Sequence, residues 1–276
     1  MKKLSIILIT IVFCLPLLSK AQVATGSAPA TTSSAPATTV SKTPDKGFKP
    51  FSFGLKAIPS LSFVKPNVKD FKNANPTANF GYGLMAEFNF APNYGFFTGI
   101  EINSNGGNID YIPSVSKVYY LPEGGKDTSR FYLTSMKYTV KYLNIPLLLK
   151  LKTNEIGVLK YYGQFGVDAG FRLKSTATYK GTSGDEKPDI LIGSEINLIR
   201  LGLNIGLGAE YNLSGNTSLV FGLNYNNGFT NFLKKESKYV YVDNGKPAYS
   251  DGSPQNPKLT QSAYNSYVAL TLGILF

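Results

Sequence analysis

The sequence predicts an all-β protein: an eight-stranded antiparallel up-and-down transmembrane β-barrel with long extracellular loops, preceded by a signal peptide and a disordered linker. Three observations predict it. The chain opens with an apolar export segment, followed by a stretch too polar to fold. From Phe51 onward, apolar and polar residues alternate with a period of two, which is typical of a membrane-spanning barrel. The connections between consecutive predicted strands are short and long in turn.

Residues 1–21 form the predicted signal peptide. Lys2 and Lys3 precede the apolar stretch 4–18, and cleavage is expected after Ala21. The alternative is an uncleaved membrane anchor. However, this apolar stretch is shorter than the roughly 20 residues that a spanning helix needs. We therefore expect export across the inner membrane and a location in the outer membrane.

Two residue types that carry much of enzyme chemistry, cysteine and histidine, are missing from the chain that remains after the predicted cleavage. Cys14, the only cysteine, lies inside the signal peptide after Phe13, where a lipoprotein signal has a small residue. Lipidation is therefore not expected, and the cleaved chain has no thiol for disulfides or zinc and iron-sulfur sites. The chain holds no histidine, which excludes Ser-His-Asp catalysis. We predict no enzyme, with no catalytic residue, no metal site and no cofactor.

The charge of the chain favours lipid over nucleic acid as a partner. The formal charge of +11 falls to +8 when the three lysines of residues 1–21 are removed. No basic run is longer than two residues, whereas nucleic-acid binding requires a clustered basic stripe. We expect no nucleic-acid partner and contact with the anionic headgroups of outer-membrane lipid or glycolipid.

Residues 22–50 form the predicted linker. They are dominated by Ala, Thr, Ser and Pro, with a near repeat at 27–32 and 34–39. Such a composition buries too little apolar surface to fold, and its prolines keep it semi-extended. A tether to the cell wall or to a partner protein is the alternative. The barrel is predicted to occupy residues 51–276.

The first four strands are predicted over residues 51–57, 82–90, 96–103 and 137–151. In each, one face is apolar and the other carries glycine, polar or charged residues. Pro146 cannot donate a hydrogen bond to a neighbouring strand, so we expect a local bulge there. The apolar faces are Phe51, Phe53, Leu55 and Ala57; Tyr82, Leu84, Ala86, Phe88 and Phe90; Phe96, Thr98, Ile100 and Ile102; and Leu143, Ile145, Leu147, Leu149 and Leu151.

The last four strands are predicted over residues 162–173, 200–211, 218–226 and 267–276. The final strand ends at Phe276 and resembles the C-terminal signal that the outer-membrane assembly machinery reads, so we expect that machinery as a partner during insertion. The apolar faces are Phe165, Val167, Ala169, Phe171 and Leu173; Leu201, Leu203, Ile205, Leu207, Ala209 and Tyr211; Leu219, Phe221, Leu223 and Tyr225; and Val268, Leu270, Leu272, Ile274 and Phe276.

The opposite faces predict a narrow polar lumen. Small glycines there make room for long charged side chains, and an eight-stranded barrel is about wide enough for its own side chains. Buried charges without partners cost several kcal/mol each, so we expect a structural ion-pair network and no water-conducting pore. A selectivity ring is the alternative. The predicted network consists of Lys56, Glu87, Glu101, Lys150, Asp168, Arg172, Arg200 and Glu210.

The connections set the predicted orientation. Residues 91–94, 152–160 and 214–216 make the three shorter turns, and the four long loops are 64–79, 104–136, 174–196 and 229–263. Barrels of this class place short turns on the periplasmic side and long loops outside. Within the loops we expect extra strands at 118–121, 130–133 and 239–242, the last followed by an Asn-Gly turn.

Tyrosines are unusually frequent in the long loops. Aromatic residues are favoured at protein interfaces, so these tyrosines predict a contact surface. The alternative is that they only pack the hairpins together. The predicted contact residues are Tyr119, Tyr120, Tyr132, Tyr239 and Tyr241.

Residues 142–150 read Tyr-Leu-Asn-Ile-Pro-Leu-Leu-Leu-Lys, and glycine-spaced strands follow at 162–173 and 206–211. Over residues 51–276 the chain resembles the PorT-like outer-membrane β-barrel family, although that family often has an acidic residue in place of Asn144. The resemblance implies a barrel fold and envelope or secretion-system proteins as partners. We therefore expect a non-enzymatic outer-membrane protein with a structural, assembly or secretion-related role. A surface binding protein or adhesin is the alternative, and a small-solute channel is a third class.

Overall fold

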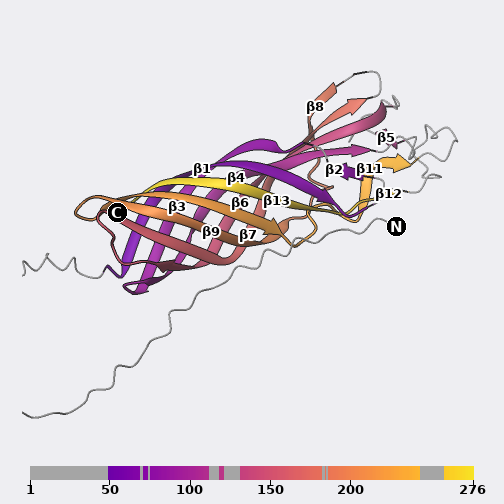
Figure 1. Cartoon of the computed structure of the whole chain (residues 1–276). Helices are drawn as coiled ribbons and strands as arrows, with labels where there is room; N and C mark the ends of the chain where they lie inside the picture. Colours follow the sequence, from indigo (N-terminus) through magenta and orange to yellow (C-terminus); the bar gives the residue numbers. More distant parts are fainter. Residues whose placement is uncertain are drawn as a thin grey trace, which may run out of the picture. The chain divides into compact units, whose positions relative to one another are not determined.

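The computed structural model describes residues 49–68, 71–73, 75–111, 118–120, 131–181, 184, 186–242 and 258–276. The predicted signal peptide and most of the predicted linker lie outside these residues. The described part is built from strands (Figure 1). They are β1 (Phe51–Pro66), β2 (Phe71–Asn73), β3 (Thr77–Ala91), β4 (Tyr94–Tyr111), β5 (Val118–Tyr120), β6 (Phe131–Lys152), β7 (Leu159–Gly181), β8 (Glu186–Leu191), β9 (Ile199–Ser214), β10 (Thr217–Gly228), β11 (Glu236–Val242), β12 (Lys258–Thr260) and β13 (Ala263–Leu275).

Eight long strands close into a barrel. In the order β1, β3, β4, β6, β7, β9, β10 and β13, each pairs antiparallel with the next. β13 then pairs with β1, with Leu275 opposite Gly54, which closes the ring of eight strands. This arrangement confirms the predicted eight-stranded up-and-down barrel.

The strands are longer than predicted at the end opposite the short turns. β4 continues to Tyr111, β6 begins at Phe131 and β7 continues to Gly181. The predicted loops 104–136 and 174–196 are therefore wrong in part, because much of each is paired strand. The outward residues of these stretches are polar, so they lack the apolar face by which the membrane-spanning strands were recognised.

Short strands add to this end of the barrel (Figure 1). β2 pairs with β4, β8 pairs with β7, and β5 joins β6 to β11. The predicted extra strands at 118–121 and 239–242 are present in β5 and β11. The Asn-Gly turn at 244–245 lies outside the described residues.

The predicted bulge at Pro146 is wrong. The register of β4 and β6 is the same before and after it, with Phe97 opposite Leu148 and Glu101 opposite Asn144. Between those pairs the ladder is interrupted, because proline has no N–H to donate. The register shift in this part of the β6–β7 pair falls instead between Lys141 and Tyr142.

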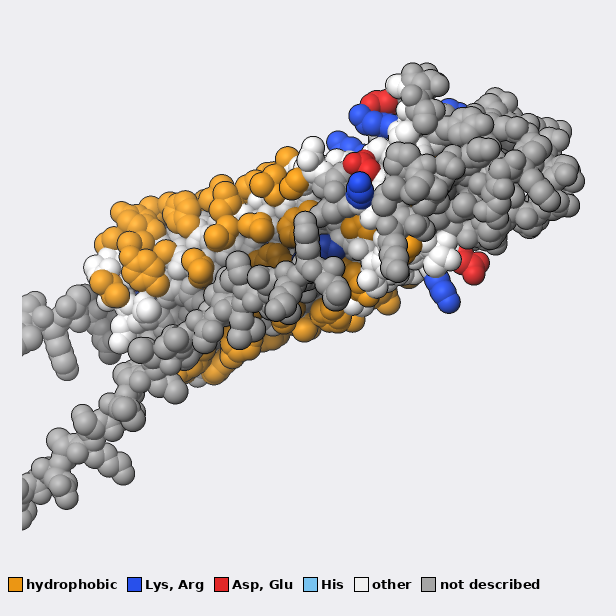
Figure 2. All heavy atoms as spheres, turned by 45° about the vertical axis from the view of Figure 1, so that its right-hand side comes forward, with side chains coloured by type: hydrophobic (Ala, Val, Ile, Leu, Met, Phe, Trp, Pro, Cys, Tyr) orange, Lys and Arg blue, Asp and Glu red, His pale blue; other side chains and the backbone are white. Residues whose placement is uncertain are grey.

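An apolar belt surrounds the barrel wall. On β6 it runs from Leu143 to Leu151, and nine residues of tilted strand span roughly 20–25 Å, the thickness of the apolar band of such barrels. Figure 2 shows hydrophobic side chains over the wall and charged ones gathered toward the extended end. In the described part of the chain, no helix is long and apolar enough to cross a membrane.

Candidate functional site

The lumen holds a cluster of paired charges near the short turns. The Lys150 ammonium donates to Glu87 Oε2 at 2.8 Å and pairs with Glu210. Lys152 pairs with Glu87 and lies 3.6 Å from Glu210. All four side chains are buried, and the two cations match the two carboxylates. Lys150 Nζ also lies 4.2 Å from the ring centroid of Tyr162.

Lys152 is the member of this cluster that the sequence prediction missed. The sequence could have revealed it, because side chains two residues apart in a strand point to the same side, so Lys152 faces the lumen as Lys150 does. We predicted that this strand ended at residue 151, which left Lys152 in a turn. The strand continues to Lys152, and the next residues form the turn to β7.

Two further ion pairs lie farther along the lumen. The Lys56 ammonium pairs with Glu101, and Asn103 Nδ2 donates to Glu101 Oε2 at 2.9 Å. Asp168 lies 3.5 Å from the Arg200 guanidinium and accepts hydrogen bonds from the Asn226 amide at 3.1 Å and the Tyr267 hydroxyl at 3.3 Å.

Of the eight predicted lumen residues, Arg172 lies outside the network. It is half-buried, and its Nη1 donates to the carbonyl of Gly193 and, at 2.9 Å, to that of Ile196. Arg172 has the same parity along β7 as Asp168, so its partners rather than its place in the alternation separate it from the network. Arg172 therefore holds the connection between β8 and β9.

The lumen is filled. Between the ion pairs lies a cavity of about 20 Å³, which is enough for about one water molecule. Phe97, Leu148, Tyr162 and Val220 form an apolar cluster across it. The Gln164 amide donates to the Asn224 side chain at 2.6 Å and fills the adjoining layer.

A second hydrophobic core occupies the extended end. It includes Ile109, Tyr138, Tyr179 and Phe232, all at most 1 % exposed, and the slightly more exposed Tyr111. The rings of Tyr138 and Phe232 meet edge to face, with their centroids 5.6 Å apart. Burial raises the pKa of Tyr138 and of Tyr111, both of which lie beyond the apolar belt. The barrel is therefore covered at this end by packed side chains.

The predicted contact tyrosines lie on paired outer strands. Tyr119 of β5 is opposite Tyr132 of β6 on one side and Tyr241 of β11 on the other. Tyr120 is opposite Val240. Tyr239 lies in β11. The positions of these side chains lie outside the described part of the structure.

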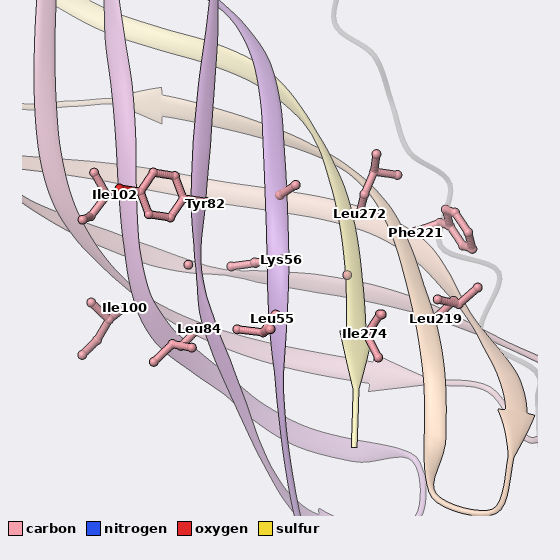
Figure 3. A pocket seen from close by; sticks show the side chains of 13 residues that line it. Leu55, Lys56, Tyr82, Leu84, Ile100, Ile102, Leu219, Phe221, Leu272 and Ile274 are labelled. Carbon is pink, nitrogen blue, oxygen red and sulfur yellow. The ribbon is translucent and has the colours of Figure 1, made fainter.

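A large hollow lies on the outside of the barrel. It has a volume of about 780 Å³ and crosses the junction of β1 with β13. In Figure 3, Leu55, Leu84, Ile100, Leu272 and Ile274 are among the side chains around it. This wall belongs to the apolar belt, so lipid chains are its natural contacts. Among the described residues, no group of three or more acidic, histidine or cysteine side chains is placed to hold a metal ion.

Comparisons with solved structures return outer-membrane proteins. OprG from Pseudomonas aeruginosa is 13% identical, with 84% of this chain and 98% of that chain covered and a TM-score of 0.41. Neisserial surface protein A is 10% identical, with 81% and 95% covered and a TM-score of 0.36. Ail of Yersinia pestis, solved with the heparin analogue sucrose octasulfate, is 14% identical, with 83% and 100% covered and a TM-score of 0.36. Such values say nothing about activity.

No curated protein matches the sequence. A family profile described as outer membrane protein beta-barrel domain matches residues 34–234. The match covers most of the chain and reaches from the predicted linker through β10. It agrees with the closed barrel and its apolar belt. The chain therefore belongs to the outer membrane protein beta-barrel domain family and is an outer-membrane β-barrel protein.

Proposed function

We propose that this protein is a non-conducting, non-enzymatic anchor that presents an outward β-sheet extension for a structural, assembly or secretion-related role in the cell envelope. The observation that carries the proposal is the filled lumen. Paired charges occupy it, a cavity of about 20 Å³ remains, and a hydrophobic core covers its extended end. A barrel filled in this way serves as a support for what it displays.

Conductance measurements test the non-conducting part. We expect the refolded mature protein to give no stepwise conductance in planar bilayers, because solutes would have to displace the ion pairs and the core. Stepwise currents that scale with protein concentration would identify a small-solute channel and contradict the proposal. A general porin measured in the same bilayers provides the positive control.

The partners we propose are envelope or secretion-system proteins, as the PorT-like motif at 142–150 suggests. Crosslinking in cells tests this with a variant in which residues 118–130 are replaced by a short Gly-Ser linker. The excision stops there because Leu133 is buried in the outer core. We expect the variant to fold, to keep its barrel and to lose specific crosslinked envelope proteins. An unchanged set of crosslinked proteins would argue against this segment as the contact.

A second candidate is a surface binder that acts through its tyrosines. The pairing that sets Tyr119 between Tyr132 and Tyr241 supports it, because it gathers three tyrosines on adjacent outer strands. A binder should lose capture of host or matrix ligands in the 118–130 variant, with the envelope crosslinks unchanged. The two candidates therefore differ in which readout the same variant alters.

The proposal includes export by a signal peptide cleaved after Ala21 and insertion by the outer-membrane assembly machinery. The closing strand supports the insertion step, since Phe276 exchanges backbone hydrogen bonds with Phe53, 2.7 and 3.3 Å long. The intact mass of the protein purified from outer membranes tests the cleavage site. A chain that begins at Gln22 is the expected result, and a full-length chain would contradict it.

A further inference from the structure

A second hollow lies on the outer wall, where β3 separates from β4. Their pairing ends with Gly81 opposite Asn103, while β3 stays paired with β1 as far as Thr77. At this end of β3, a side chain of β1 bonds directly to β4. The Ser62 hydroxyl accepts a hydrogen bond from the Gly106 amide at 3.1 Å and donates one to its carbonyl at 2.8 Å. A hollow of about 440 Å³ opens beside the separated strands.

This hollow has an apolar half and a polar half. Phe80, which is 57 % exposed, and Ile102 line it on the side of the apolar belt. Ser104, Lys137 and Lys141 line the other side. The hollow therefore straddles the level at which the wall changes from apolar to polar, where lipid headgroups lie.

The polar half is strongly basic. Lys137 and Lys141 are exposed on the same outward face of β6, and Lys141 lies opposite the exposed Lys174 of β7. Like charges directly opposite each other across a strand pair destabilise a sheet. Among the described residues, no carboxylate lies within 4.0 Å of these three ammonium groups, whereas Lys56 and Lys150 in the lumen are paired. An external anion would offset this repulsion.

We propose that the hollow binds a phosphate-bearing headgroup of an outer-leaflet glycolipid, with an acyl chain along Phe80 and Ile102. Lysine ammonium groups are suitable point charges for phosphate, and the hydroxyl of Ser104 adds a neutral donor. Basic residues at a membrane surface attract anionic headgroups over about a Debye length. The apolar half explains why the occupant is a lipid rather than free phosphate. This inference is independent of the proposed envelope role.

The test is lipid binding by the full mature protein, refolded in a zwitterionic detergent. Native mass spectrometry would measure the binding of diphosphorylated lipid A to the wild type and to the double variant Lys137→Gln/Lys141→Gln. We expect binding at least about tenfold weaker in the double variant, because two of the basic groups at the headgroup level are removed. The matched control is Lys234→Gln/Lys235→Gln, which removes the same charge from exposed positions outside the hollow.

The control variant and Lys137→Arg/Lys141→Arg should both bind like the wild type. Equal weakening in the control would show a general charge effect and overturn the proposal, as would unchanged binding in the Gln variant. Competition by millimolar inorganic phosphate alone would mean that the site takes the free ion. Equal binding of zwitterionic phosphatidylcholine would mean that the hollow is only an apolar contact. Heat-dependent gel mobility checks that every variant is folded.

Discussion

Lys150 shows how a fully charged side chain is accommodated inside this barrel. It is 1 % exposed, and its ammonium lies between Glu87 of β3 and Glu210 of β9. An isolated charge at this depth would cost several kcal/mol, so both carboxylates and the nearby Tyr162 ring are needed to stabilise it. The residue therefore stabilises the barrel from within the lumen.

Replacing Lys150 by Met should lower the free energy of unfolding by about 3–5 kcal/mol, because two buried carboxylates then share Lys152 alone. The measurement is the urea concentration at which folded gel mobility is lost. Lys160→Met is the control, since that side chain is 40% exposed and its loss should cost less than about 0.5 kcal/mol. Adding Glu210→Gln to Lys150→Met should restore part of the loss. Equal midpoints for the two lysine variants would contradict the prediction.

Tyr138 predicts how the outer core responds to alkali. Burial raises its pKa well above the ordinary value, so an unfolded tyrosine ionises first as the pH rises. The stabilisation is complete below about pH 10, the unfolded pKa, and is lost as the pH rises toward the folded pKa. Tyrosinate absorbance should show a late-titrating fraction, and Tyr138→Phe should reduce it. A single titration near pH 10 in a barrel that is still folded would be the contrary result.

At the scale of the strands, glycine makes room for the long side chains of the lumen. The Tyr162 side chain of β7 crosses β9 and β10 at Gly208 and Gly222. A Cβ at either glycine would lie 2.5 Å from its hydroxyl oxygen. The Tyr162 hydroxyl donates to the Phe221 carbonyl at 3.3 Å. Small residues on two strands thus allow a large ring to fill the interior from a third.

Gly208→Ala should therefore destabilise the barrel by about 1–3 kcal/mol, because both the ring and the Phe221 carbonyl would have to move. Gly163→Ala is the matched control. It follows Tyr162, the residue of β7 that lies opposite Gly208, and a Cβ at Gly163 would meet nothing within 4 Å. Urea midpoints compare the two variants. The packing argument fails if both alanines have the same effect.

For the molecule as a whole, closure of the sheet is the central event. It joins the first and last strands of the barrel, β1 and β13. The backbone N–H of each of Phe53 and Phe276 donates to the carbonyl of the other, and their ring centroids lie 5.8 Å apart. A closed sheet leaves no unpaired edge in the membrane, which lipid could not satisfy. Phe276 therefore contributes to the seam of the barrel, which is the pairing of β1 with β13.

Deleting Phe276 should reduce the yield of folded barrel in refolding from urea into lipid vesicles, because two seam hydrogen bonds and the ring contact are lost. The fraction with fast gel mobility measures this yield. Phe276→Leu keeps the backbone bonds and should fold better than the deletion. A deletion that folds as well as the wild type would show that the seam does not need its last residue.

Period-two alternation by itself determined the barrel, its eight strands and which side chains point inward. Side-chain parity in a strand does not depend on its partners, so Glu87, Lys150 and Asp168 could be placed in the lumen from the sequence. Parity does not choose a side chain's partners, however: Arg172 shares the parity of Asp168 but donates to the carbonyls of Gly193 and Ile196. It also cannot identify strands without an apolar face, so most of the outer parts of β4, β6 and β7 was predicted as loop. The exception is the extra strand predicted at 130–133, which overlaps the start of β6.

Only the tertiary structure decided which charges meet and where the wall opens. Glu87 and Lys150 are 63 residues apart, and their contact depends on how the closed sheet staggers its strands around the lumen. The basic hollow beside Lys137 and Lys141 likewise arises because residues 77–80 of β3, which precede Gly81, do not pair with β4. Parity is a local property of each strand, whereas contacts across a barrel follow from closure, which joins residues distant in the chain.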